Sequence, residues 1–215
     1  MSSSIASTSQ LDSIDLLTNY FTAAPRDLFK GFHHLIFWNK QYTGRENHFS
    51  KTTLGAFSNV FEAFNLVDFV DNANKLRRYL LGKDIRDIKD AALLLSDTSG
   101  SFCDSVSWLS AMMGIISISS YATSWITSVS GSSLMFGFAV RSIEILGDLK
   151  NISRADERRV QFLMLVKNVA LFAIGVLVFS CGWYSTALSS VKITLCSSAV
   201  LISSLAIHFI RSKNY

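Results

Sequence analysis

Arg141 and Glu144, two charged residues next to a long hydrophobic stretch, are the side chains whose types and spacing could support chemistry within a membrane. They are three residues apart, so a helix would place them on one face, where they could neutralise each other. An ion pair inside a bilayer is expensive and often marks an ion or solute pathway. The alternative, which we favour, is that this helix is short and Arg141 extends to the membrane interface.

The other reactive side chains form no recognisable catalytic or metal-binding pattern. His33 and His34 are adjacent, so a helix turns them to different faces, and no cysteine or carboxylate stands at ligand spacing. Cys103, Cys181 and Cys196 are scattered without a CxxC pair. We therefore predict no catalytic residue, no metal site, no cofactor and no enzyme activity.

Two further titratable residues stand beside hydrophobic stretches. His208 is near the end of the last stretch, where we expect an interface residue rather than a proton relay. Asp104 precedes an earlier stretch and is expected to mark an interface rather than to act as a base. The sequence contains no GxGxxG, GxxxxGK[ST] or GxSxG motif, so it offers no nucleotide-binding or hydrolase signature.

The composition favours a lipid environment. Only 17% of the residues are charged and 49% are hydrophobic, whereas about a quarter of an average soluble chain is charged. The formal net charge is +4, and the basic residues form short clusters beside hydrophobic stretches rather than a stripe with interleaved aromatics. This pattern follows the positive-inside rule of membrane proteins. The sequence predicts a lipid bilayer as partner and no nucleic acid.

The clearest membrane signal is a pair of stretches without formal charge, residues 168–191 and 193–210. Each is close to the ~20 residues that a helix needs to cross a hydrocarbon core of ~30 Å. The segment between their apolar parts is too short to return across a membrane, so the helices must turn at one surface and run antiparallel. We predict a two-span helical hairpin over residues 162–210, followed by a basic tail at 211–215.

Basic residues on both sides of the hairpin predict its orientation. Under the positive-inside rule, the clusters before and after it face the cytosol, and the short turn with Lys192 faces the other side. Charges around the earlier hydrophobic block have the same bias, which predicts an even number of spans with all large polar parts in one compartment. The topology residues are Arg158, Arg159, Lys167, Arg211 and Lys213.

The earlier hydrophobic block covers residues 105–147 and makes one or two spans. Its many serines can bond back to their own helix, and small residues allow close helix packing. Trp108 and Trp125 are expected at the two interfaces of a first span, and residues 128–133 are expected to form a tight turn. A polar linker at 148–161 then leads to the hairpin.

The first half of the chain has mixed polarity and predicts amphipathic helices. Residues 27–40 place apolar side chains at helical spacing after Pro25, which fits a helix start. A turn is expected at 41–47, followed by a long helix interrupted at Gly82. The predicted fold is therefore an all-α integral membrane protein: helical hairpins preceded by a helical amphipathic, cytosol-facing region at 27–104.

The chain begins MSSSIASTSQ, which is rich in Ser and Thr and lacks the basic start and apolar core of a secretory leader. Residues 1–26 are predicted to be a flexible N-terminus. A sharper hypothesis is that this segment is an uncleaved type III export signal.

In its organisation the chain resembles the chlamydial inclusion membrane proteins. The Ser-rich start, the lack of a secretory leader and the two-lobed apolar segment from Leu163 to Ile210 carry the resemblance. It implies a type III secreted effector inserted in the membrane of a pathogen vacuole, the inclusion, with soluble arms that recruit host cytosolic proteins. The extra hydrophobic block upstream departs from the single lobed pair of many members.

A rival resemblance is to the peroxisomal membrane-elongation family, carried by KLRRYLLGKDIRDIKDAALLLSD, VSWLSAMMGI and VKNVALFAIGVL. It implies a peroxisomal protein that bends the bilayer with a basic amphipathic helix. A channel or transporter using Arg141, Glu144 and His208 ranks last, because the spans have no proline and few glycines. Homo-oligomerisation stays open.

Overall fold

The computed structural model describes residues 17–18, 20, 23–44, 48–82, 87–113, 118–185 and 187–213. This part of the chain contains helices and short connections but no strand, so the predicted all-α membrane fold is confirmed. The Ser/Thr-rich start, with its hypothetical export signal, lies outside the described residues. The helices are α2 (Pro25–Thr43), α3 (His48–Leu80), α4 (Ile88–Met113), α5 (Ser120–Leu149), α6 (Ala155–Tyr184) and α7 (Ser190–Lys213).

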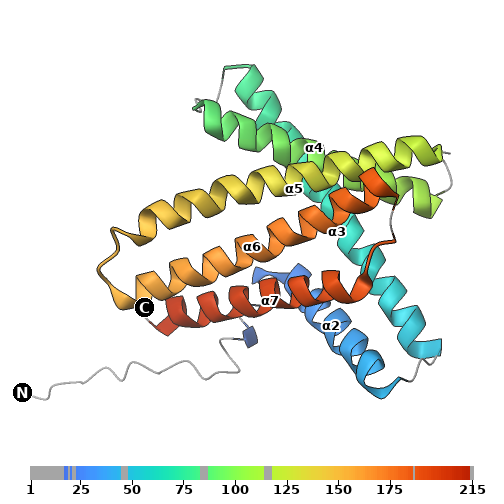
Figure 1. Cartoon of the computed structure of the whole chain (residues 1–215), viewed down its shortest axis with the longest axis horizontal. Coiled ribbons are helices and arrows are strands. Elements are labelled where there is room, and N and C mark those ends of the chain that lie inside the picture. The colour runs from blue at the N-terminus through green and yellow to red at the C-terminus, as the bar shows by residue number, and fades with distance from the viewer. Residues whose placement is uncertain are drawn as a thin grey trace, which may run out of the picture.

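The helices pack in chain order and close into a ring. Each helix contacts the next one along the chain, and α2 returns to contact α7. Helices α5, α6 and α7 lie side by side with alternating direction, and α3 runs across them at a steep angle (Figure 1). The first and last described helices are therefore neighbours in space.

The two helices of the predicted C-terminal hairpin, α6 and α7, run antiparallel, joined by a short turn in which Ser185 adopts a left-handed conformation (φ 51°). The polar linker before them is shorter than the predicted 148–161. Helix α5 continues to Leu149 and α6 already begins at Ala155. The physical reason is that Asp156 and Glu157 favour the first turn of a helix, where acids stabilise the positive end of its dipole.

The earlier hydrophobic block is divided at a different place from the one predicted. Helix α4 extends to Met113, and α5 starts after Ser119, whose hydroxyl accepts a bond of 3.2 Å from the Ala122 N–H. The predicted turn at 128–133 is instead the middle of α5, because these small residues pack against α6, with Gly131 beside the backbone of Phe179. Trp108 and Trp125 consequently lie on two different helices.

The predicted helix start at Pro25 and the break at Gly82 are confirmed, whereas α2 extends into the predicted turn at 41–47, whose residues 45–47 lie outside the described part. Pro25 occupies the first position of α2, and Gly44 ends that helix with a φ of 63° and a backbone N–H bonded to Lys40. Gly82 follows α3 with a φ of 66°. Both glycines adopt the left-handed conformation that closes helices and disfavours other residues.

Candidate functional site: the membrane-spanning bundle

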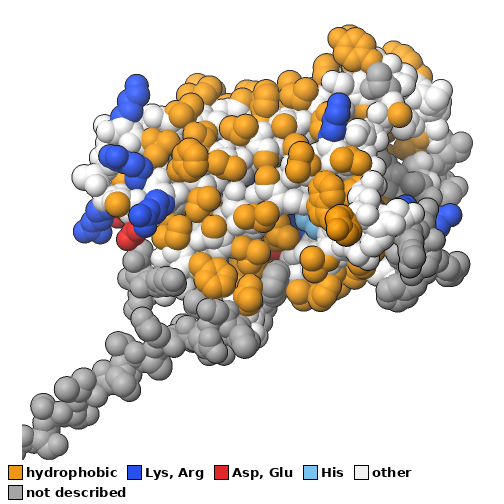
Figure 2. All heavy atoms as spheres, turned by 60° about the horizontal axis from the view of Figure 1, so that its bottom comes forward, with side chains coloured by type: hydrophobic (Ala, Val, Ile, Leu, Met, Phe, Trp, Pro, Cys, Tyr) orange, Lys and Arg blue, Asp and Glu red, His pale blue; other side chains and the backbone are white. Residues whose placement is uncertain are grey.

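Helices α5, α6 and α7 are the three helices, among the described residues, that are long and apolar enough to cross a membrane. They expose large apolar side chains: Leu195 and Ile202 of α7, for example, are 60% and 65% exposed. Figure 2 shows hydrophobic side chains over the length of the molecule and a group of cations at one end. An apolar surface of this extent is costly in water and suited to lipid. The bundle is compatible with a membrane protein.

Aromatic residues cluster at the end of the bundle where α5 begins and α6 ends. The Trp125 ring lies 6.3 Å from that of Tyr121 and 6.4 Å from that of Trp183, which in turn stacks on Phe179. Tyr121, Trp125, Trp183 and Tyr184 are each at least half exposed. Exposed tryptophan and tyrosine side chains at one level are typical of the boundary between lipid and water.

Arginines occupy the opposite end of the same helices. Arg154 and Arg158 stand at the start of α6, and Arg211 is in the last turn of α7. Figure 2 shows Lys and Arg side chains gathered at one end of the molecule, next to the hydrophobic surface. The part of α6 between Arg158 and Trp183 is roughly 37 Å long at 1.5 Å per residue, which matches a hydrocarbon core of ~30 Å with its interfaces.

The structure places most of the predicted topology residues together. Arg158, Arg159 and Arg211 share the arginine end, and Lys213 is the last residue of α7, although its side chain lies outside the described part. Lys167 differs, because it lies more than two turns further along α6. Lys192 is at the aromatic end, in the first turn of α7, as the predicted hairpin orientation requires.

Helices α5 and α6 are in backbone contact. A Cβ atom added at Gly131 would lie 2.7 Å from the Cα atom of Phe179, and one added at Gly182 would lie 2.6 Å from the backbone nitrogen of Ser128. Gly175 faces α5 in the same way, with 2.9 Å to a backbone nitrogen. The expected use of small residues for close helix packing is confirmed at this interface.

Helix α4 meets α5 through charged and polar groups, a set that we call the polar seam. Arg141 donates through Nη2 to Asp97 Oδ2 at 2.6 Å, and Glu144 pairs with Lys89. Each member of the predicted Arg141–Glu144 pair therefore has a separate partner on α4. The physical reason is that α4 places an opposite charge directly across from each of them.

The polar seam continues along both helices. Ser130 donates to Asp104 Oδ1 at 2.6 Å, and Ser96 donates to the carbonyl of Ser133 at 3.0 Å. Asp104 thus contacts the middle of α5, whereas the sequence places it at a membrane interface. From Glu144 to Ser130, α4 accompanies a helix that is long and apolar enough to span a membrane.

Helix α2 is docked on α7 rather than standing away from the bundle. His34 Nε2 lies 3.1 Å from Ser197 Oγ, and Trp38 donates to Ser198 Oγ at 3.1 Å. His34 is buried and His33 is half-buried, and their rings lie 5.8 Å apart. The described residues include no group of His, Cys, Asp and Glu that could hold a metal ion.

Two more side-chain contacts involve the N-terminal part of the chain. Arg26 of α2 donates to Asp68 of α3 at 2.6 Å and also bonds to Asn65. The His208 ring of α7 packs 5.2 Å from the ring of Tyr20. The ring of helices is thus closed by polar side chains as well as by apolar ones.

Sequence reasoning missed the partners in the polar seam and part of the aromatic cluster. Lys89, Asp97 and Asp104 are separated by eight and seven residues, which returns them to nearly one face of a helix, and this spacing is the signal that could have revealed them. Trp183 and Tyr184 follow the most apolar part of the uncharged stretch 168–191, which is where interfacial aromatics are expected.

No family model, curated protein or solved structure matches this chain. Its function is therefore inferred from its own residues. Those residues provide three neighbouring apolar helices with aromatics at one end and arginines at the other.

Proposed function

We propose that this chain is a non-enzymatic multi-span membrane protein in which α5, α6 and α7 cross the bilayer with the arginine end in the cytosol. The observation that carries the proposal is the segregation of arginines and aromatic residues to opposite ends of the same apolar helices. The positive-inside rule supports the cytosolic assignment of the arginine end. Helices also satisfy their backbone polar groups internally, as hydrocarbon requires.

The polar seam supports a fourth crossing by α4. Asp97 and Asp104 both contact polar partners on α5, so these carboxylates do not need to face lipid. Leu95 and Phe102 are at least half exposed and suit a lipid environment. With α4 included, the start of α4 lies on the arginine side, which gives the even number of spans that the sequence predicts.

Within this membrane protein, α3 provides an interaction surface for another protein. Val67 and Val70 are exposed beside a groove of about 620 Å³ that Asp71 and Asn74 border. Exposed apolar residues with a polar rim are typical of protein interaction sites. The role of a type III secreted effector that binds a host protein in an inclusion membrane is supported by the sequence organisation described above.

Cysteine accessibility tests the topology. In a chain whose three native cysteines are changed to serine, new single cysteines at Asp87, Ser153 and Ser189 are labelled with a membrane-impermeant maleimide in sealed vesicles. We expect Asp87 and Ser153 to react from one side and Ser189 from the other. Extraction of the protein by alkaline carbonate, or labelling of Ser153 and Ser189 from the same side, would overturn the proposal. Labelling of Asp87 with Ser189 would remove the crossing by α4.

A second candidate function, membrane shaping, is favoured by the surface of α2. Phe32 and Leu35 are 48% and 69% exposed on a helix that also carries basic residues. Such a helix can act as a wedge among lipid headgroups. The test compares tubulation of anionic liposomes by the full chain, a Phe32→Ser/Leu35→Ser variant and a matched Val67→Ser/Val70→Ser variant. Loss of tubulation in the α2 variant alone supports shaping, and smooth vesicles with the unmodified chain exclude it.

A further inference from the structure

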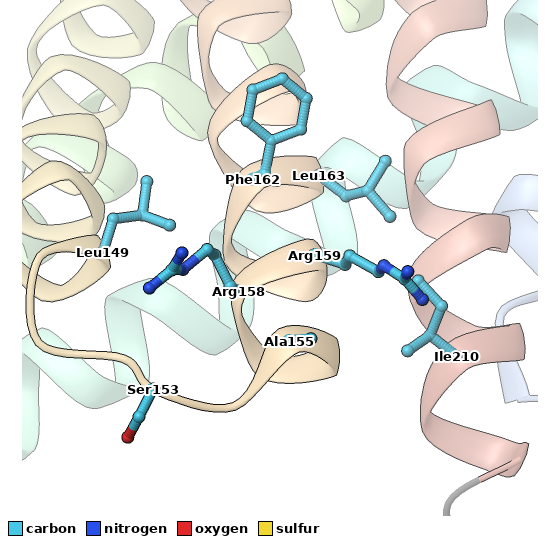
Figure 3. A pocket seen from close by; sticks show the side chains of 8 residues that line it. All are labelled: Leu149, Ser153, Ala155, Arg158, Arg159, Phe162, Leu163 and Ile210. Carbon is cyan, nitrogen blue, oxygen red and sulfur yellow. The ribbon is translucent and has the colours of Figure 1, made fainter.

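The arginine end of the bundle contains two adjoining cavities of different character. The first is about 670 Å³ and is lined by apolar side chains, including Leu149 of α5 and Phe162 of α6, together with Arg158 and Arg159. Figure 3 shows the two arginines extending from α6 in different directions, Arg158 toward Leu149 and Arg159 toward Ile210. An apolar hollow is thus bordered by two guanidinium groups.

The second cavity is about 760 Å³ and more polar. Ala155 and Ile210 line both cavities, so the two cavities lie next to each other. Arg154, Arg211 and the buried, unpartnered oxygen of Gln161 line it. An apolar space that adjoins a polar one matches the two halves of a phospholipid.

The charge balance at this end favours an anion. Four arginines line the two cavities, and Asp156 and Glu157 are the acids among the lining residues. These acids pair with Arg159 at 3.3 Å and with Arg154 at 3.4 Å. The remaining two arginines, Arg158 and Arg211, have no carboxylate partner among the described residues.

Arg158 is held in place without being neutralised. Its Nη2 donates to the carbonyl of Ile152 at 2.8 Å, in the connection between α5 and α6. A guanidinium has five N–H donors in a fixed fork, so the others remain available for a phosphate oxygen. A neutral acceptor that orients a charged group leaves that charge free to attract an anion.

Resting on the proposed membrane insertion, we propose that the arginine end binds one anionic phospholipid. Arg158 contacts the lipid phosphate, the neighbouring arginines supply the attractive field, and the acyl chains lie on Phe162 and Leu163. Basic pockets at the ends of membrane helices bind anionic headgroups for this electrostatic reason. The choice of a lipid over a free phosphate follows from the apolar cavity beside the arginines.

The test uses the full chain in a neutral detergent and measures its thermal midpoint with added phosphatidylglycerol, phosphatidylcholine or inorganic phosphate. We expect stabilisation by phosphatidylglycerol alone. Arg158→Gln and Phe162→Ser should each weaken this binding about tenfold or more, which corresponds to ~1.4 kcal/mol. Arg158→Lys, which keeps the charge, should retain part of it. Lys192→Gln, which removes a cation at the opposite end, should bind as the unmodified chain does.

Each contrary outcome has a distinct meaning. Equal stabilisation by both phospholipids, or full binding by Arg158→Gln, overturns the lipid site. Stabilisation by inorganic phosphate alone replaces it with a phosphate site and overturns the lipid assignment. If the protein resists alkaline carbonate but shows no preference for the anionic lipid, only this inference fails. If carbonate extracts the protein, the proposed membrane insertion fails first.

Discussion

Helices α6 and α4 pack against α5 through different kinds of contact. On the α6 side, Gly131 and Gly182 bring backbone against backbone. On the α4 side, Arg141 and Ser130 reach across to the carboxylates of Asp97 and Asp104. Helices surrounded by lipid gain little from the hydrophobic effect between them, so close packing and hydrogen bonds must supply the attraction. We therefore expect the α5–α6 interface to lose stability when a side chain is enlarged, and the α4–α5 interface when a charged side chain is removed.

The largest expected effect is on the backbone contact with α6. Gly131→Leu would place side-chain atoms where the backbone of Phe179 lies, so α5 and α6 must separate. We expect a loss of stability of about 3 kcal/mol or more, at the upper end for overpacking. Thermal unfolding in detergent measures it. Gly147→Leu is the matched control, because nothing lies within 4 Å of a Cβ added there. Equal behaviour of the two variants would contradict the contrast.

A smaller effect is expected from the Arg141–Asp97 contact of the polar seam. Arg141→Met leaves the Asp97 carboxylate without its partner, which we expect to destabilise the bundle by about 1–3 kcal/mol. The charge-swapped double variant Asp97→Arg/Arg141→Asp should recover part of the loss in thermal unfolding. If the double variant is no better than the singles, the pairing does not contribute to the seam.

Removal of a single hydroxyl from the polar seam should cost less. Ser130→Ala takes the 2.6 Å hydrogen bond from Asp104, and we expect a loss of about 1 kcal/mol. Ser142→Ala is the matched control on the same helix, because its hydroxyl bonds only to the carbonyl of Phe138. A denaturant titration in detergent compares the two. A control as damaging as Ser130→Ala would mean that the loss arises within α5.

The smallest effect is expected where the polar seam is most exposed. Glu144 and Lys89 are 40% and 50% exposed, so Glu144→Gln should cost less stability than Ser130→Ala does. Added salt should reduce the difference from the unmodified chain further, since exposed charges are screened. Thermal unfolding at low and high salt checks this. A loss of stability equal to that of Arg141→Met would show that the two ion pairs of the polar seam contribute equally.

The sequence predicts the elements of this fold better than their contacts. Lack of charge over 168–191 and 193–210 located the hairpin helices, and Gly82 located a helix end. These features depend on neighbours along the chain. Helix boundaries that depend on contacts with a neighbouring helix are harder to predict from the sequence.

The run at 128–133 illustrates the limit. Serine and glycine are typical both of turns and of close helix contacts, and only the presence of α6 beside Gly131 decides between them. The partners of Arg141 and Glu144 pose the same problem. Spacing of three residues favours a local pair, whereas the structure uses residues more than forty positions earlier in the chain.

The docking of α2 on α7 has a consequence for biosynthesis. Trp38 and His34 of α2 contact Ser198 and Ser197 of α7. Helix α2 is synthesised well before α7, so these contacts form only after α7 has been made. Contacts between segments so distant in the chain form late and slowly. A chain whose synthesis ends before α7 would therefore have an open ring of helices, and α2 would lack its packing partner.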